Sequence, residues 1–164
     1  MSERAPGPLT IRALATSDAD WLRGASEGVG GLVVVSRGAL HRLPQLPGFV
    51  AEQGGERVGF ASYRPDGEAC ELVAIASLHE RRGIGRALIA AVSAAAARAG
   101  ARRLWLVTTN DNVGALRFYQ LTGFRLVAVH LDAVDRSRAL KPSIPALGHD
   151  NIPIRDELEL SKPL

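Results

Sequence analysis

The stretch HERRGIGRALIAAVSAAAARAG (residues 79–100) places three arginines around two glycines and continues into an alanine-rich segment. Apolar side chains recur in it at helical spacing, at Ile84, Leu88, Ala91 and Ala95. This spacing predicts a helix that begins after Gly83 and ends near Gly100. The first turn of a helix has four unpaired N–H groups and a partial positive charge. We therefore expect a negatively charged group to bind at residues 81–86.

A pyrophosphate or a phosphate ester is the group that this loop suits best. Gly83 and Gly85 would let it approach the backbone, and three side chains would add charge-assisted hydrogen bonds: Arg81, Arg82 and Arg86. The simpler alternative is a helix start that is solvated by exposed arginines. A dinucleotide fingerprint is excluded because Leu88 stands where its third glycine is needed. A GxxxxGK[ST] loop is excluded because the chain has no lysine before residue 141.

The chain before this loop predicts one strand, one helix and then an antiparallel meander. Alternating or β-branched runs predict strands at 9–14, 48–53, 57–64 and 68–77, separated by turns at GGE (54–56) and PDG (65–67). A helix is expected from about Thr16 to Gly28. The run GLVVVS (31–36) is of strand type between irregular neighbours, so we expect a short strand or a loop there.

The chain after this loop continues with two more strand–helix units. We expect a strand buried on both faces at 102–109, a helix from Val113 to about Thr122 that is capped by NDN (110–112), and a strand at 124–131. Residues 132–156 are rich in loops, with a short helix at 133–141, before a last strand at 155–160. The whole chain, 1–164, is therefore expected to be one α+β domain with a mixed, mostly antiparallel sheet flanked by helices.

Composition excludes several classes of protein. The 164 residues are 46% apolar and 23% charged, and Cys70 is the only cysteine. With one cysteine, no internal disulfide can form. No apolar run is long enough to span a bilayer, and the N-terminus lacks the apolar core of a signal peptide. We therefore expect a cytoplasmic protein without membrane partners. The net charge of +3 comes from 18 arginines and two lysines spread among 17 acidic residues, and aromatic residues are only 5%. We therefore expect no nucleic-acid partner. A homodimer stays open.

A second segment, NDNVGALRFYQLTGFRLV (110–127), follows about 25 residues after the glycine loop. Together with ERRGIG (80–85), it resembles the GNAT acyltransferase superfamily. The loop matches the pattern [QR]-x-x-G-x-[GA], and the second segment matches a block whose shared positions are Asn112, Ala115, Phe118, Tyr119, Gly123 and Phe124. One position departs from the family: Glu80 stands where glutamine or arginine is usual, so we leave it out of the binding set.

The resemblance implies a GNAT-like fold and acetyl-CoA, or another acyl-CoA, as cofactor. It also implies that the strand before the loop diverges from its neighbour and pairs its backbone with the pantetheine arm, although Ile75 would serve equally well as a plain core residue. The cofactor-binding residues implied are Ile75, Ala76, Ser77, Arg81, Arg82, Gly83, Ile84, Gly85, Arg86, Ala87, Asn112, Ala115, Phe118 and Tyr119.

The reaction implied is direct transfer of an acetyl group to a primary amine. Tyr119 matches the family position that usually protonates the departing thiolate, and the alternative is an aromatic residue that fills space beside Phe118. Glu71 is the candidate base; in a regular strand it shares a face with Val73 and Ile75. The alternative for Glu71 is an edge carboxylate paired with an arginine. His41 and His149, both expected in irregular loops, are other candidate bases.

The acceptor stays open among small amines, amino acids, aminoglycosides and protein N-termini or lysines. Two long irregular segments, 35–49 and 141–157, are expected to carry specificity. Arg37 and His41 are the candidate substrate-binding residues, with His149 and Asp150 as further polar candidates, and no metal site is expected. Two other functions stay open beside the enzyme: a non-catalytic acyl-CoA-binding sensor, and a partner-binding module on the same fold.

Overall fold

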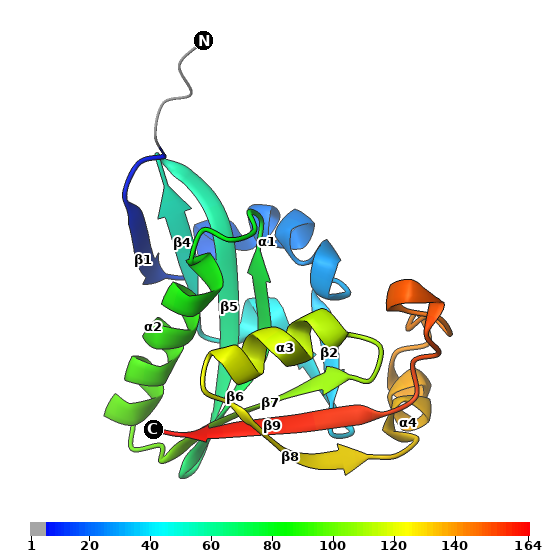
Figure 1. Ribbon diagram of the computed structural model, residues 1–164. Coiled ribbons are helices and arrows are strands. Elements are labelled where there is room, and N and C mark those ends of the chain that lie inside the picture. The colour runs from blue at the N-terminus through cyan, green and yellow to red at the C-terminus, as the bar shows by residue number, and fades with distance from the viewer. Residues whose placement is uncertain (1–5) are drawn as a thin grey trace.

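The computed structural model describes residues 6–164, which form a curved mixed sheet with helices on both of its faces (Figure 1). Within these residues the main sheet has seven strands in the order β1-β4-β5-β6-β7-β9-β8, and a separate hairpin pairs β2 with β3. The strands of the main sheet are β1 (Leu9–Ala13), β4 (Gly48–Gln53), β5 (Glu56–Asp66), β6 (Ala69–Ser77), β7 (Arg103–Thr109), β8 (Arg125–His130) and β9 (Glu157–Pro163). The hairpin strands are β2 (Val33–Ser36) and β3 (Ala39–Arg42), and the helices are α1 (Ala19–Ala25), α2 (Ile84–Arg98), α3 (Val113–Leu121) and α4 (Ala133–Leu140).

The first half of the main sheet is the predicted antiparallel meander. Gly54 and Gly55 both have positive φ, at 62° and 85°, and make the tight turn between β4 and β5. The turn expected at 65–67 lies one to two residues later, because β5 continues through Asp66, which pairs with Ala69 of β6. A register shift interrupts β5 and β6 where Tyr63 pairs with Leu72.

Helix α2 connects β6 to β7, which are parallel, and it covers one face of the sheet together with α3 (Figure 1). Its buried side chains, at helical spacing, are Ile84, Leu88, Ile89, Val92 and Ala96. They pack against the inner side chains of β4–β7, among them Ala51, Leu72 and Leu104. Gly59 of β5 makes this contact close, since a Cβ there would lie 2.8 Å from the Ile84 side chain.

The opposite face of the sheet is covered by α1 and the β2–β3 hairpin (Figure 1). Leu22 of α1 and Leu43 are fully buried there against Phe60 and Ala74. The GLVVVS run is thus a short strand, and its hairpin turns at Arg37 and Gly38, which have φ of 49° and 74°. Arg37 is a non-glycine residue in the left-handed region, a conformation that costs about 1 kcal/mol.

The last strand, β9, lies between β7 and β8 and is antiparallel to both. Hydrogen bonds hold both ends of the segment between α4 and β9. At its C-terminal end, the Asn110 side chain, just after β7, accepts hydrogen bonds from the amides of Arg155 and Asp156. At its N-terminal end, the Lys141 ammonium donates to the carbonyls of Gly30 and Val33 at 2.6 and 2.7 Å. The predicted α+β fold with a mixed, mostly antiparallel sheet is confirmed. None of the helices in residues 6–164 is both long and apolar enough to cross a membrane.

Candidate active site

The main sheet forks between β6 and β7. The two strands pair over only three positions, Ala69–Glu71 against Arg103–Trp105. Beyond Glu71, β6 pairs with β5 alone, and beyond Trp105, β7 pairs with β9 alone. Within residues 6–164, the backbone of residues 72–77 therefore has one edge without a strand partner. Ile75 packs its side chain into the core, Ala76 is half-buried and Ser77 is exposed.

Helix α2 begins beside the end of β6 with an open set of amides. Its first hydrogen bond runs from the Ala87 N–H to the Gly83 carbonyl at 3.0 Å, and no side chain in the described part of the chain caps this end. The amides of residues 84–86 precede that bond. Gly83 has φ of 73° and Arg81 has φ of 59°, so two left-handed residues shape the loop. The side chains of Arg81 and Arg82 are exposed, and so is that of Glu80.

Gly85 and Arg86 have a structural role that the sequence did not indicate. A Cβ on Gly85 would lie 2.8 Å from Cζ of Phe118, so the missing side chain lets the Phe118 ring of α3 pack on α2. Arg86 donates from Nη1 to the carbonyl of Leu121 at 3.3 Å, at the C-terminal end of α3. These contacts join the two helices. Phosphate access at Gly85 and a phosphate contact at Arg86 stay predictions.

Helix α3 starts as predicted, because the Asn112 side chain accepts a hydrogen bond from the Ala115 amide at 3.1 Å. One turn on, the ring of Tyr119 lies 5.5 Å from that of Phe118 and 5.8 Å from that of Phe124. Burial raises the pKa of Tyr119 to about 12, so the phenol stays protonated at neutral pH. It thus combines a space-filling ring with an O–H group that can donate a proton.

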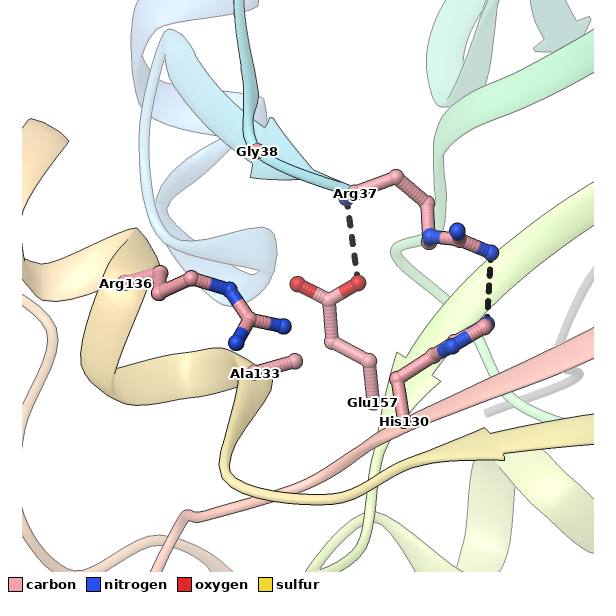
Figure 2. A pocket seen from close by; sticks show the side chains of 6 residues that line it. All are labelled: Arg37, Gly38, His130, Ala133, Arg136 and Glu157. Carbon is pink, nitrogen blue, oxygen red and sulfur yellow. Dashed lines mark hydrogen bonds between the residues drawn. The ribbon is translucent and has the colours of Figure 1, made fainter.

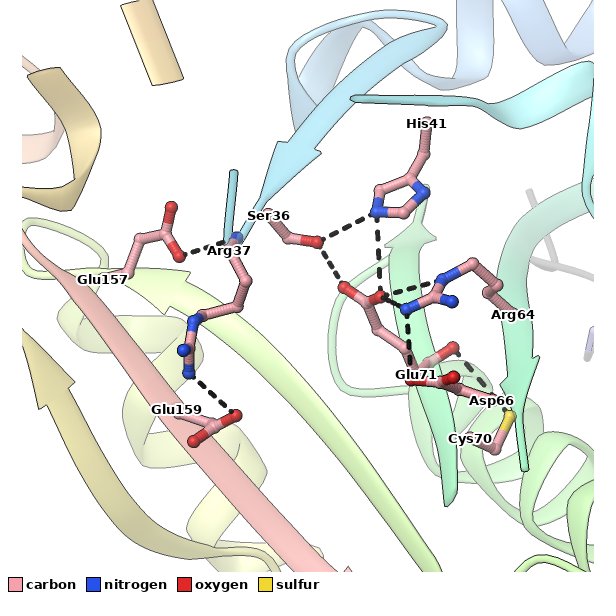
Figure 3. A network of polar contacts seen from close by, with 9 residues as sticks. All are labelled: Ser36, Arg37, His41, Arg64, Asp66, Cys70, Glu71, Glu157 and Glu159. Carbon is pink, nitrogen blue, oxygen red and sulfur yellow. Dashed lines mark hydrogen bonds and ion pairs between the residues drawn. The ribbon is translucent and has the colours of Figure 1, made fainter. Parts of the chain in front are cut away.

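Glu71 lies where the fork opens, and its side chain is only 1% exposed. It points to the face covered by the β2–β3 hairpin (Figure 3). The prediction that it shares a face with Ile75 is wrong. The register shift in β6 adds one residue at Val73, so Val73, Ala74 and Ala76 pack on the α1 side while Ile75 packs on the α2 side.

Three side chains, two from the β2–β3 hairpin and one from β5, meet at Glu71 (Figure 3). Ser36 donates its hydroxyl to Oε1, and Arg64 donates to Oε2 at 3.2 Å. His41 Nε2 lies 3.7 Å from the same Oε2 and 3.1 Å from Ser36 Oγ. Glu71 is therefore paired with an arginine, as the alternative interpretation supposed, but inside a central strand rather than at an edge.

His41 is a buried strand residue rather than the solvated loop histidine that the sequence indicates. It lies on β3 and its side chain is 7% exposed. Burial lowers its pKa, although the charge of Glu71 partly opposes this effect. Because the Ser36 hydrogen is given to Glu71, Ser36 Oγ is free to accept from His41 Nε2–H. This pattern of donors favours a neutral imidazole whose Nδ1 can accept a proton.

The other candidate residues lie apart from this network. His149 is 64% exposed, and its Nδ1 lies 2.9 Å from Oδ2 of the buried Asp111. Burial alone would raise the pKa of Asp111, but hydrogen bonds from Thr109 and His149 outweigh it and the pKa is lowered. Asp150 is exposed. Within residues 6–164 no cluster of three or more His, Cys, Asp or Glu side chains could hold a metal ion.

A small cavity of about 130 Å³ lies next to the network, on the other side of Ser36 (Figures 2 and 3). It is lined by Arg37, Gly38, His130, Ala133, Arg136 and Glu157. Of these, sequence reasoning had singled out Arg37 alone. One signal was present: Glu157 and Glu159 occupy alternate positions of the last strand, which places two carboxylates on one face.

Comparison with known proteins agrees with the predicted resemblance. The Acetyltransferase (GNAT) family profile matches residues 20–124. The uncharacterized protein YdhI of Bacillus subtilis (strain 168) is 43% identical over 124 residues, which are 75% of this chain and 78% of YdhI.

Two solved structures share the fold at low sequence identity. The IAA acetyltransferase from Bacillus cereus ATCC 14579 has a TM-score of 0.72 at 21% identity, covering 96% of this chain and 100% of that chain. A GNAT family acetyltransferase from Elizabethkingia anophelis, solved with acetyl-CoA bound, also has a TM-score of 0.72 at 21% identity, covering 95% of this chain and 98% of that chain. On the family match and the similarity to YdhI, the chain belongs to the GNAT acetyltransferase family.

Proposed function

We propose that this protein is an N-acetyltransferase that transfers the acetyl group of acetyl-CoA to a primary amine by direct attack. The observation that carries the proposal is the fork between β6 and β7, which has the open amides of α2 beside the end of β6 and the Glu71 network at its closed end. The acetyl-CoA bound to the Elizabethkingia anophelis protein supports this choice of acetyl donor.

The residues of the chain fit this donor. The amides of residues 84–86, with Arg81 and Arg82, would bind its diphosphate. The free backbone edge of Ile75, Ala76 and Ser77 would pair with the pantetheine arm. The remaining contacts implied by the family are those of Gly83, Ala87, Asn112, Ala115, Phe118 and Tyr119. When bound, acetyl-CoA supplies an acetyl group activated as a thioester.

Tyr119 would assist the departure of the CoA thiolate. With its pKa near 12, the phenol holds its proton throughout the pH range of an assay. Complete proton transfer to a thiolate of pKa about 8.5 would cost about 5 kcal/mol, at 1.36 kcal/mol for each pKa unit. Its main contribution would therefore be a hydrogen bond that strengthens as negative charge develops on the sulfur.

The amine must lose a proton, and the Glu71 network would take it. Converting an alkylammonium of pKa about 10.4 to the reactive amine at pH 7 costs about 4.6 kcal/mol. Glu71 already accepts hydrogen bonds from Ser36 and Arg64, so removing its charge would leave Arg64 without its buried partner. The neutral imidazole of His41 would accept the proton instead, and Glu71 would stabilise the imidazolium that forms. Direct deprotonation by Glu71 is the second candidate route.

The proposal is tested first by binding and then by turnover. Acetyl-CoA at 100 times its Kd should stabilise the folded protein by about 2.7 kcal/mol, which a thermal shift detects. CoA release, read as free thiol, should then appear with some members of a panel of primary amines. Changing both Arg81 and Arg82 to glutamine should raise the KM for acetyl-CoA, whereas Arg98→Gln at the other end of α2 should not.

Each outcome separates the open functions. No stabilisation at millimolar acetyl-CoA contradicts the proposal. Stabilisation without turnover of any amine supports the non-catalytic sensor instead. Stabilisation together with turnover excludes the pure binding module.

A further inference from the structure

The cavity beside Ser36 contains charged groups that the acetyl donor does not account for. Glu157 lies within it and is 2% exposed, although it is a carboxylate. Its Oε2 accepts a hydrogen bond from the Arg37 amide at 3.0 Å, and its Oε1 accepts from the Ser137 hydroxyl at 3.2 Å. Figure 2 shows the Arg136 guanidinium directed from α4 toward this carboxylate.

The β2–β3 turn holds one wall of the cavity in a fixed position. Arg37 adopts φ of 49°, a conformation that glycine would adopt at lower cost. In this conformation its amide donates to Glu157, and its Nη1 lies 2.6 Å from His130 Nε2 and 3.4 Å from Glu159 Oε1. Strained residues that are held by several contacts are frequent at ligand sites. The guanidinium of Arg37 is thus occupied by protein partners.

Arg136 is an exposed residue of α4, and among the charged groups that line the cavity in residues 6–164 it is the one without an ion pair or hydrogen bond. Within residues 6–164 its guanidinium makes no ion pair and no hydrogen bond, although it has five N–H donors. A planar guanidinium suits a carboxylate, which it can bind through two parallel hydrogen bonds. The volume of the cavity equals that of about four waters at about 30 Å³ each, enough for a carboxylate and a few carbon atoms.

The cavity is also connected to the Glu71 network. Ser36 donates to Glu71, and the next residue, Arg37, donates its amide to Glu157 (Figure 3). Because Ser36 and Arg37 are consecutive residues, a carboxylate bound in the cavity would lie one residue along the chain from the side chain that contacts Glu71. On the basis of the proposed function, we infer that the acceptor is an amino acid or a similarly small amino carboxylate, whose carboxylate is bound by Arg136.

The inference is tested with pairs of acceptors that differ only in the carboxylate. Each amino acid is compared with its carboxamide by the rate of CoA release, at a pH where both amines are mostly uncharged. At least one amino acid should have a kcat/KM ten or more times that of its carboxamide. Arg136→Gln should abolish this preference by raising KM for the amino acid tenfold or more, while KM for the carboxamide changes less than twofold. Arg125→Gln, an exposed arginine on β8 outside the cavity, is the matched control.

Three results would overturn the inference. The first is that carboxamides and amino acids have equal kcat/KM. The second is that Arg136→Gln lowers kcat/KM by the same factor for both. The third is no amino acid binding by calorimetry to the protein saturated with CoA, even if other amines are acetylated. A different result would be amino acid binding that depends on Arg136 without any acetylation. It would support the carboxylate site but contradict the proposed reaction, so failure of the inference and failure of the proposed function are distinguishable.

Discussion

Glu71→Gln is the substitution that tests the proposed proton transfer most directly. Glutamine keeps the shape of the side chain and can still accept the Ser36 hydrogen bond, so the main change is the loss of one negative charge. That charge lies 3.7 Å from His41 Nε2, and both side chains are at most 7% exposed. At this distance, two unit charges attract by about 1 kcal/mol at the dielectric constant of water and by about 4.5 kcal/mol at an effective value of 20.

These limits set the expected loss of activity. Removing the charge should lower kcat/KM for the amine by about 10-fold to 1000-fold at pH 7, at 1.36 kcal/mol for each factor of ten. The acid limb of the pH profile should also move to lower pH, since the charge of Glu71 raises the pKa of His41 and its loss lowers it further.

The assay is CoA release across pH 5–9, together with thermal unfolding to confirm that the variant is folded. Glu68→Gln, where the side chain is 81% exposed just before β6, is the control and should change neither quantity. A folded Glu71→Gln protein with unchanged kcat/KM and an unchanged acid limb would refute the assigned role of this carboxylate.

Three further substitutions test other parts of the structure. Tyr119→Phe should lower kcat about 100-fold with little change in KM for acetyl-CoA; full activity with the chemical step limiting would show that the phenol is not the acid. Gly85→Ala should destabilise the fold by about 1–3 kcal/mol, because the new Cβ would lie 2.8 Å from Phe118. Adding Phe118→Leu should restore part of this lost stability, which thermal unfolding of the double variant measures. Asp18→Asn should lower the free energy of unfolding by about 2–4 kcal/mol at pH 7, as measured with urea. The reason is that Arg12 and Arg57 both pair with this buried carboxylate and hold its pKa well below the ordinary range. Since the native pKa of Asp18 is depressed, this stabilisation is present above the ordinary aspartate pKa of about 3.9 and is lost as the pH falls below it. The free energies of unfolding of the wild-type protein and of Asp18→Asn should therefore converge in acid. A difference between them that stayed constant with pH would contradict the pairing.

Local patterns predicted most of the fold because they depend on neighbouring residues. The helical spacing from Ile84 marks α2, and the Asn112 side chain caps α3 as expected. The glycine pair at 54–55 marks the turn between β4 and β5. Even the short helix predicted at 133–141 matches α4 within one residue. In each case the signal lies within one turn or one strand of the element that it specifies.

The site was harder to predict because its partners are distant in the chain. Ser36 lies 35 residues from Glu71, and Arg37 lies 120 residues from Glu157, so no local pattern links either pair. The face of Glu71 was mispredicted because one extra residue in β6 reverses the alternation, which a regular period of two cannot show. The packing of Gly85 on Phe118 was not predicted because Phe118 belongs to another helix, 33 positions later in the chain.

The short pairing of β6 with β7 also has a mechanical consequence. Three residue pairs are the whole ladder between the N-terminal strands and the C-terminal strands of the main sheet, so this seam should open at lower free energy than the ladders on either side. A pantetheine arm lying between the two strands would act as a crosslink across the seam. Amide hydrogen exchange in residues 72–77 should therefore slow down more than that of β4 or β5 when the donor binds.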